Sequence, residues 1–200
     1  MKGHNAMESE VVYYESVRTD NTETTFDLVR KKLNTSGIKK LVLASTTGVT
    51  AKKAVDFFKE MDVKIVVVAH QYGFLRETNR FPQELAKTIR NAGHEVHFGT
   101  MLFHTEDFYG SSIPTIMANL LRCFSQGTKV CFEIALMATD AGLLASGEKV
   151  IAIAGTGRGA DTALVMQAAS SRNLKKLKVN EMICKPLNLS ERGDALQKES

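Results

Sequence analysis

Short apolar runs that alternate with helical patterns constrain the fold of this chain more than any other feature. Residues 64–69 (Lys-Ile-Val-Val-Val-Ala) form an almost unbroken β-branched run, which is typical of a strand buried on both faces. Residues 50–61 instead repeat their apolar side chains at helical spacing, as at Ala51, Ala54 and Phe58. This alternation predicts a three-layer α/β fold with a mostly parallel sheet and right-handed crossovers.

The sequence predicts a strand or a helix for most of the chain. The strands are expected at about residues 40–44, 64–69, 94–98, 149–154 and 177–184. The helices are expected at about residues 22–36, 50–61, 82–93, 112–124, 129–145 and 160–171, from apolar spacing and from capping, proline and glycine signals. A short extended piece is expected at residues 11–14 and a long loop at residues 99–111.

Size and composition favour one domain over residues 1–200. The 200 residues are 44% hydrophobic, enough for one sizeable core at about residues 11–188, with loose tails at 1–10 and 190–200. No stretch has the length and apolar character of a membrane span. The first residues lack the apolar region of a signal peptide. We therefore expect a cytoplasmic protein.

Charge and cysteine content exclude several classes of partner. The formal net charge of +4 is small and its lysines are scattered, so no nucleic-acid or membrane partner is expected. Cys123, Cys131 and Cys184 show no C-x-x-C spacing, and their apolar neighbours favour buried thiols. His94 and His97 fall on opposite faces of a strand, so no metal site is expected there.

Two glycine-bearing loops follow predicted strands, and both are expected to lead into helices. Residues 44–50 read Ala-Ser-Thr-Thr-Gly-Val-Thr, and residues 155–162 read Gly-Thr-Gly-Arg-Gly-Ala-Asp-Thr. A strand-to-helix turn directs free backbone N–H groups and the positive end of a helix dipole at one spot, which suits a phosphate. The candidate binding residues are Ser45, Thr46, Thr47, Gly48 and Thr50 in the first loop and Gly155, Thr156, Gly157, Arg158 and Gly159 in the second.

Neither loop matches a standard nucleotide motif. Gly48 is followed by Val-Thr-Ala, so the G-x-x-x-x-G-K-[ST] pattern is absent. The second loop, with Gly155, Gly157 and Gly159, is one residue short of the dinucleotide fingerprint and follows the fourth strand. ATP hydrolysis and NAD binding are therefore disfavoured. Each loop alone also fits an ordinary turn with structural glycines, whereas the pair favours a binding site.

A resemblance to a known family adds to this interpretation. Residues 40–55 (Lys-Leu-Val-Leu-Ala-Ser-Thr-Thr-Gly-Val-Thr-Ala-Lys-Lys-Ala-Val) resemble the C-terminal domain of pyruvate kinase, where a Thr/Ser-Gly-x-Ser/Thr loop holds a phosphate of the allosteric sugar bisphosphate. Residues 146–157 are similar to the Gly-Asp turn, strand and glycine-rich loop of that domain. The resemblance covers about residues 38–184 and excludes the catalytic barrel, so pyruvate kinase activity is not implied.

The whole chain also resembles a stand-alone family of small, mainly archaeal proteins with this fold. That resemblance implies a five-stranded sheet of order 3-2-1-4-5 with the last strand antiparallel, and association with flavin mononucleotide (FMN) in some members. In this order strands 1 and 4 are neighbours at the point where the winding of the sheet reverses, and open α/β sheets bind ligands there. Both glycine loops would then line one cleft.

Other residues are candidates for contact with a ligand or for chemistry. His70, Tyr72 and Gly73 follow the second strand and are expected near a bound ring system, with an ordinary loop as the alternative. His70 and His104 are candidates for proton transfer, because histidine titrates near neutrality. Glu133 near the start of its helix either faces solvent or points into the cleft.

The leading hypothesis is a protein that binds a phosphorylated small molecule, with FMN as the expected cofactor. One alternative is a regulatory sensor of a sugar phosphate or nucleotide without catalysis. Another is a flavin-dependent or phosphate-ester enzyme that uses His70 or His104. A homo-oligomer is compatible with each of these, since small α/β domains often pair through symmetric interfaces.

Overall fold

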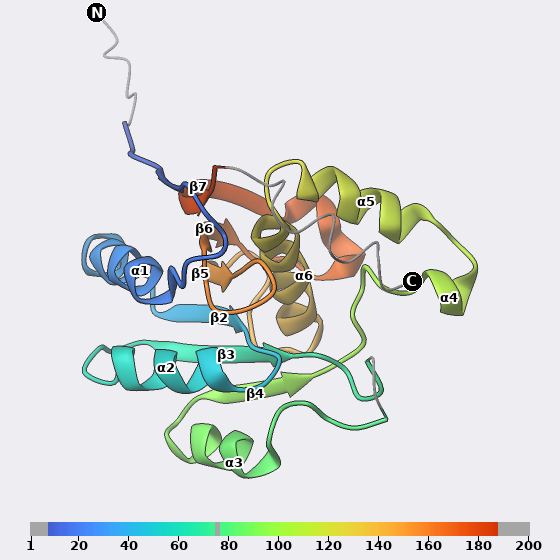
Figure 1. Ribbon diagram of the computed structural model, residues 1–200, viewed down its shortest axis with the longest axis horizontal. Helices are drawn as coiled ribbons and strands as arrows, with labels where there is room; N and C mark the ends of the chain where they lie inside the picture. The colour runs from blue at the N-terminus through green and yellow to red at the C-terminus, as the bar shows by residue number, and fades with distance from the viewer. Residues whose placement is uncertain (1–7, 75–76, 188–200) are drawn as a thin grey trace, which may run out of the picture.

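A seven-stranded mixed sheet forms the centre of the computed structural model, which describes residues 8–74 and 77–187 (Figure 1). Its strand order is β1-β7-β6-β5-β2-β3-β4. The strands are β1 (Val12–Tyr14), β2 (Lys40–Ala44), β3 (Lys64–Ala69), β4 (Glu95–Phe98), β5 (Lys149–Ala154), β6 (Thr162–Gln167) and β7 (Lys178–Pro186). Residues 1–7 and 190–200 of the predicted tails lie outside the described residues.

Helices cover both faces of the sheet and complete three layers. They are α1 (Thr22–Ser36), α2 (Val49–Phe58), α3 (Gln83–Asn91), α4 (Glu106–Tyr109), α5 (Ile113–Arg122), α6 (Gln126–Asp140) and the 3-10 helix η1 (Ser171–Lys176). Helices α1, α2 and α3 pack in one core, and α5 and α6 pack in a second core on the opposite face (Figure 1). The predicted α/β/α layering is thus confirmed.

The central strands are buried on both faces, as their continuous apolar runs predict. Leu41 and Leu43 point into the core beneath α1 and α2, whereas Val42 between them points into the core beneath α6. Strands β2, β3, β4 and β5 are mutually parallel, with Leu41 beside both Ile65 and Ile151. Their carboxyl ends therefore meet at the same edge of the sheet.

The predicted helix at residues 160–171 is wrong, because this segment forms strand β6. Val165 and Met166 are buried on opposite faces of the sheet, so the run is apolar at nearly every position. A short apolar run of this kind gives no periodicity that separates a buried strand from a buried helix. Only the stretch at residues 171–176 is helical, as η1.

The expected five-strand order therefore holds only in part. The first four predicted strands are neighbours as expected, in the order β4-β3-β2-β5. The strand next to β5 is β6, which pairs antiparallel with it, and the predicted last strand lies one position further out as β7. Because β7 is antiparallel to β6, it runs in the same direction as β5. The short piece expected at residues 11–14 adds β1 to the outer edge, parallel to β7.

Candidate functional site

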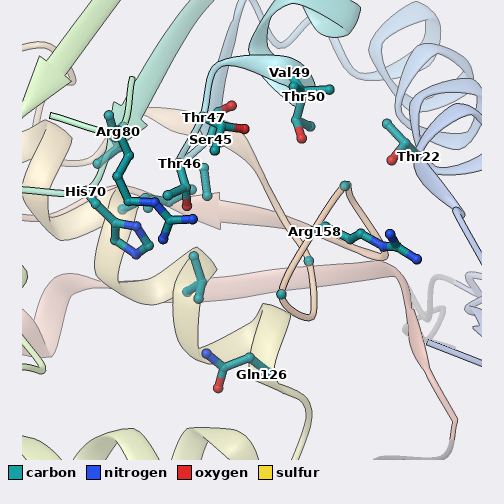
Figure 2. A pocket seen from close by; sticks show the side chains of 18 of the residues that line it. Thr22, Ser45, Thr46, Thr47, Val49, Thr50, His70, Arg80, Gln126 and Arg158 are labelled. Atoms are coloured by element: carbon teal, nitrogen blue, oxygen red, sulfur yellow. The ribbon is translucent and has the colours of Figure 1, made fainter. Parts of the chain in front are cut away.

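A pocket of about 510 Å³ opens where β2, β3 and β5 end (Figure 2). Ser45, His70 and Gly155, the residues that directly follow these three strands, all line it. The sequence prediction that the two glycine loops line one cleft is thus supported by the geometry. The volume lies within the range of small-molecule binding sites.

The first loop leaves a row of backbone donors available at the start of α2. The Ser45 hydroxyl accepts a hydrogen bond from the amide of Ala51 at 3.2 Å, which fixes the turn. Among the described residues, no acceptor takes a hydrogen bond from the amides of residues 46–50. Hydroxyls of Thr46, Thr47 and Thr50 line the same pocket (Figure 2).

Gly48 allows the backbone to make this turn. Its φ of 85° lies in the left-handed region that favours glycine. A Cβ atom there would stand 2.4 Å from Cδ2 of Leu85 on α3. Gly48 does not line the pocket, so its role is to shape the loop that presents residues 46–50.

The second loop connects β5 to β6 and is a hairpin connection, not the predicted strand-to-helix turn. It therefore has no helix dipole of its own. The amide of Thr156 donates to the Asp161 carboxylate at 2.8 Å, and the amide of Ala160 donates to the Thr22 hydroxyl at 2.9 Å. Thus one amide expected to face a ligand, that of Thr156, is engaged within the protein, as is the amide of Ala160 next to the candidate residues.

Three helices nevertheless begin at the pocket. Thr22 is the first residue of α1, Gln126 is the first residue of α6, and both line it together with the first turn of α2. Helices that precede or follow parallel strands start at the carboxyl edge of the sheet, so their positive dipole ends gather there. This convergence favours an anionic group in the pocket.

Cationic side chains surround the same space. Arg80 and Arg158 line the pocket from opposite sides, with Arg80 beside His70 (Figure 2). In the described part of the chain, neither arginine belongs to an ion pair. Lys53 also lines the pocket but is 3.2 Å from the carboxylate of Asp20. The arginines are thus the cations available to a ligand.

His70 lines the pocket, and its Nδ1 is a buried polar atom without a hydrogen-bond partner among the described residues. Burial, together with the nearby positive charge of Arg80, lowers the pKa of His70 to about 4. The ring stacks on Phe74, with centroids 4.5 Å apart. His70 is therefore a neutral hydrogen-bonding group at pH 7 and not a cation.

Glu133 and Lys129 form a buried ion pair on α6 beside the pocket. Their side chains are 3% and 1% exposed, and Lys129 Nζ lies 2.6 Å from Glu133 Oε2. The other carboxylate oxygen accepts the amide of Phe103 at 2.8 Å and lies 3.4 Å from Nδ1 of His104. Burial would raise the pKa of Glu133, but the hydrogen bonds and the charge of Lys129 together lower it to about 2.

One wall of the pocket is apolar. It is formed by Val68, Met101, Val130, Ile134 and Met137. The pocket therefore pairs a polar, electropositive end with an apolar surface, which is typical of sites for amphiphilic small molecules.

A comparison with known families identifies the chain. The sequence model of the pyruvate kinase alpha/beta domain matches residues 23–166. The chain belongs to this family. The match extends from the second residue of α1 to β6 and so includes both loops that line the pocket.

Solved pyruvate kinases resemble this family member only distantly. Two structures of pyruvate kinase from Cryptosporidium parvum match 76% of the chain at 14% sequence identity, with TM-scores of 0.41 and 0.39. The same enzyme in complex with ADP matches 83% at 16% identity, with a TM-score of 0.35. The chain covers only 23–26% of the length of these enzymes.

Most of the predicted site residues of this alpha/beta domain meet at the pocket. Those that line it are Ser45, Thr46, Thr47, Thr50, His70, Gly155, Gly157, Arg158 and Gly159. Gly48, Thr156, Tyr72, Gly73 and His104 are not among the lining residues. The Tyr72 side chain is 60% exposed and donates to the carbonyl of Glu77 at 2.8 Å. His104 instead contacts Glu133, which does point into the cleft.

Sequence reasoning missed several polar residues of the pocket. They are Asp20, Thr22, Lys53, Arg80 and Gln126. Asp20, Thr22 and Gln126 lie at or just before the start of a helix. The alternation of strands and helices does predict that such helix starts lie at the carboxyl edge of the sheet. Arg80 lies in a connecting loop before α3, and no local pattern marks it. The cysteine prediction is wrong for Cys123, which is exposed.

The described residues hold neither a metal-binding cluster nor a membrane-spanning helix. Within residues 8–74 and 77–187, no three His, Cys, Asp or Glu side chains cluster closely enough to hold a metal ion. No described helix combines the length and hydropathy needed to span a bilayer.

Proposed function

We propose that the pocket binds a phosphorylated small molecule, with its phosphate on the first turn of α2. The observation that supports this most is the loop at residues 46–50, whose amides have no acceptor among the described residues and which lines the pocket through Thr46, Thr47, Val49 and Thr50. Arg80 and Arg158 can neutralise the phosphate by charge-assisted hydrogen bonds, and their guanidinium groups match its geometry.

FMN is the ligand that we propose for the first test. The apolar wall could receive one face of its ring system, and the neutral imidazole of His70, which lines the same pocket, is a hydrogen-bonding group for a polar ring edge. A flavin would supply redox chemistry when bound. The residues of this chain would orient it, exclude water from one face and hold its phosphate away from the ring.

A titration series distinguishes the contribution of the phosphate to the binding affinity from that of the ring system. FMN and riboflavin share the ring system, but only FMN carries a phosphate, so flavin fluorescence should show clearly tighter binding of FMN. Thr47→Val keeps the shape of the side chain but removes a hydroxyl, and should weaken FMN binding by roughly tenfold or more, the scale of one hydrogen bond to a charged group. The control is Thr35→Val, which makes the same change at an exposed position of α1.

Each outcome of this series has a definite meaning. No FMN binding at micromolar concentrations would end the flavin proposal. Equal affinity for FMN and riboflavin, or equal effects of the two threonine variants, would contradict a phosphate on residues 46–50.

A sensor without catalysis is the second candidate, and one feature favours it. Both carboxylates that line the pocket are engaged, Asp20 by Lys53 and Glu133 by Lys129, so neither is available as a general base. Thermal-shift measurements with sugar phosphates and nucleotides test this candidate, because a ligand that binds the folded state raises the unfolding temperature. Stabilisation by these ligands and none by FMN would favour the sensor.

A further inference from the structure

Helices α4 and α5 carry an apolar face that the core of the protein does not use. They lie in the connection between β4 and α6, where Figure 1 shows them at one corner of the molecule, beyond α6. The inner side of α5 packs against the second core through Met117, Ala118 and Leu121. Another side of the helix is exposed although it is also apolar.

Six large side chains of α4, of α5 and of the turn after α5 are exposed, and together we call them the α4–α5 face. Its members and exposed fractions are Phe108 (81%), Tyr109 (71%), Ile113 (65%), Ile116 (62%), Leu120 (67%) and Phe124 (53%). None of them lines the pocket, and none is charged. Depletion of charge and enrichment of aromatic residues distinguish the cores of protein interfaces from ordinary surface.

The exposed area of the face is large for a lone molecule. At about 200 Å² for an aromatic side chain and slightly less for Ile or Leu, these exposed fractions correspond to roughly 700 Å². The largest apolar patch on a typical monomer is about 300–600 Å². A stable dimer buries about 800 Å² on each partner, so the α4–α5 face with a few neighbouring atoms provides the area of one such interface.

The residue spacing along α5 fits a second copy of the same helix. At 100° per residue, Ile113, Ile116 and Leu120 of α5 fall within an arc of about 60° and form a stripe. Phe124 follows in the turn just after the helix ends. If two such helices pack antiparallel, Ile113 lies opposite Phe124 of the partner and Ile116 lies opposite Leu120, because both pairs share a midpoint near residue 118. A two-fold symmetric interface requires such a match, because both helices present the same stripe to each other in opposite directions.

We propose that the α4–α5 face is the interface of a symmetric homodimer in which the α5 helices pack antiparallel. This dimer does not depend on the proposed ligand, because the face and the pocket share no residue. Wild-type protein at micromolar concentrations should therefore show twice the chain mass of 22.0 kDa in size-exclusion chromatography with light scattering.

A matched pair of leucine substitutions tests the position of the interface. Leu120→Glu places a charge in the middle of the stripe and should give the mass of a monomer. Leu174→Glu makes the same change at a leucine of η1 that is 39% exposed and outside the face, and should leave the dimer intact. Circular dichroism and the unfolding midpoint check that both variants fold. A monomeric wild type, or a dimer that survives Leu120→Glu, would overturn the proposal.

Cys123 provides a test of the antiparallel arrangement. It is exposed beside the stripe, whereas Cys131 and Cys184 are buried, so a spin label should attach at this position. With a midpoint near residue 118, a rise of 1.5 Å per residue and helix axes about 9 Å apart, the two Cys123 Cα atoms should lie roughly 15–20 Å apart. A separation beyond about 30 Å, after allowance for the labels, would contradict the predicted pairing.

Discussion

Glu133→Gln tests the energetic role of the buried ion pair beside the pocket. The substitution keeps the size of the side chain and an oxygen that can accept the amide of Phe103. It removes the negative charge that Lys129 contacts at 2.6 Å, although the Lys129 side chain is only 1% exposed. A buried ammonium group without a carboxylate is costly, so we expect a large loss of folding free energy.

The lowered pKa of Glu133 gives the expected size of this loss. Burial would raise the pKa, but the hydrogen bond from His104, the charge and hydrogen bond of Lys129, and the amide of Phe103 lower it from 4.5 to about 2. Since one pKa unit corresponds to about 1.4 kcal/mol, the ionised carboxylate stabilises the fold by about 3 kcal/mol. This agrees with the 3–5 kcal/mol that is typical when a buried pair loses one partner.

The pH dependence of this stabilisation has a defined sign. Because the pKa is lower in the folded state, the contribution of Glu133 is complete above about pH 4.5 and is lost as the pH falls towards about 2. Urea denaturation at neutral pH should therefore show a free energy of unfolding about 3 kcal/mol lower for Glu133→Gln than for wild type. The difference should shrink below pH 4.

Two further variants make the test specific. Glu84 pairs with Lys87 on α3, but the two side chains are 84% and 66% exposed, so Glu84→Gln should change the free energy of unfolding by less than about 0.5 kcal/mol. Replacement of both buried partners, as in Lys129→Met with Glu133→Leu, should recover most of the lost stability. If Glu133→Gln cost no more than Glu84→Gln, the reasoning from burial would be refuted.

Two other predictions concern the walls of the pocket. Gly159→Ala should lower the free energy of unfolding by about 1–3 kcal/mol in urea, because φ is 65° and the new Cβ would lie 2.4 Å from the Thr22 hydroxyl. Gly142→Ala, at φ 73° with no atom within 4 Å, should cost less, and equal costs would argue against the steric contact. NMR should show His70 titrating near pH 4, since burial and the charge of Arg80 lower its pKa from 6.5. Because the unfolded state takes up this proton at a higher pH than the folded state, the free energy of unfolding should fall as the pH drops from about 6.5 towards 4. A His70 titration midpoint above pH 6 would contradict the lowered pKa.

The sequence predicts the parallel part of this fold well, because its signals there are both strong and distinct. Residues 64–69 form the buried strand expected from a β-branched run, and α2 follows β2 where helical spacing begins. At residues 160–171 the apolar pattern does not distinguish a strand from a helix, because both faces of this segment are buried in apolar cores. There, pairing with the neighbouring strands β5 and β7 decides for a strand, and the apolar pattern of the segment itself carries no sign of this pairing.

The site is predictable to the extent that it depends on where strands end. The convergence of the loops after β2 and β5 follows from strand order, so Thr46 and Arg158 were expected to meet. The ion pair of Glu133 with Lys129 depends on how deeply one turn of α6 is buried, which residue spacing leaves open. Arg80 reaches the pocket from a loop whose path no local pattern specifies. Such residues need the tertiary structure.

The hydrogen bond from the amide of Ala160 to the hydroxyl of Thr22 joins positions 138 residues apart, and Thr25 donates to the carbonyl of the same alanine. Closing a loop of this length is entropically unfavourable and contributes to high contact order, which slows folding. The ligand-binding shape is therefore completed only when early and late portions of the polypeptide have come together. A nascent chain that lacks β6 would carry the residue 46–50 turn without its opposite wall, so binding competence would report that folding is complete.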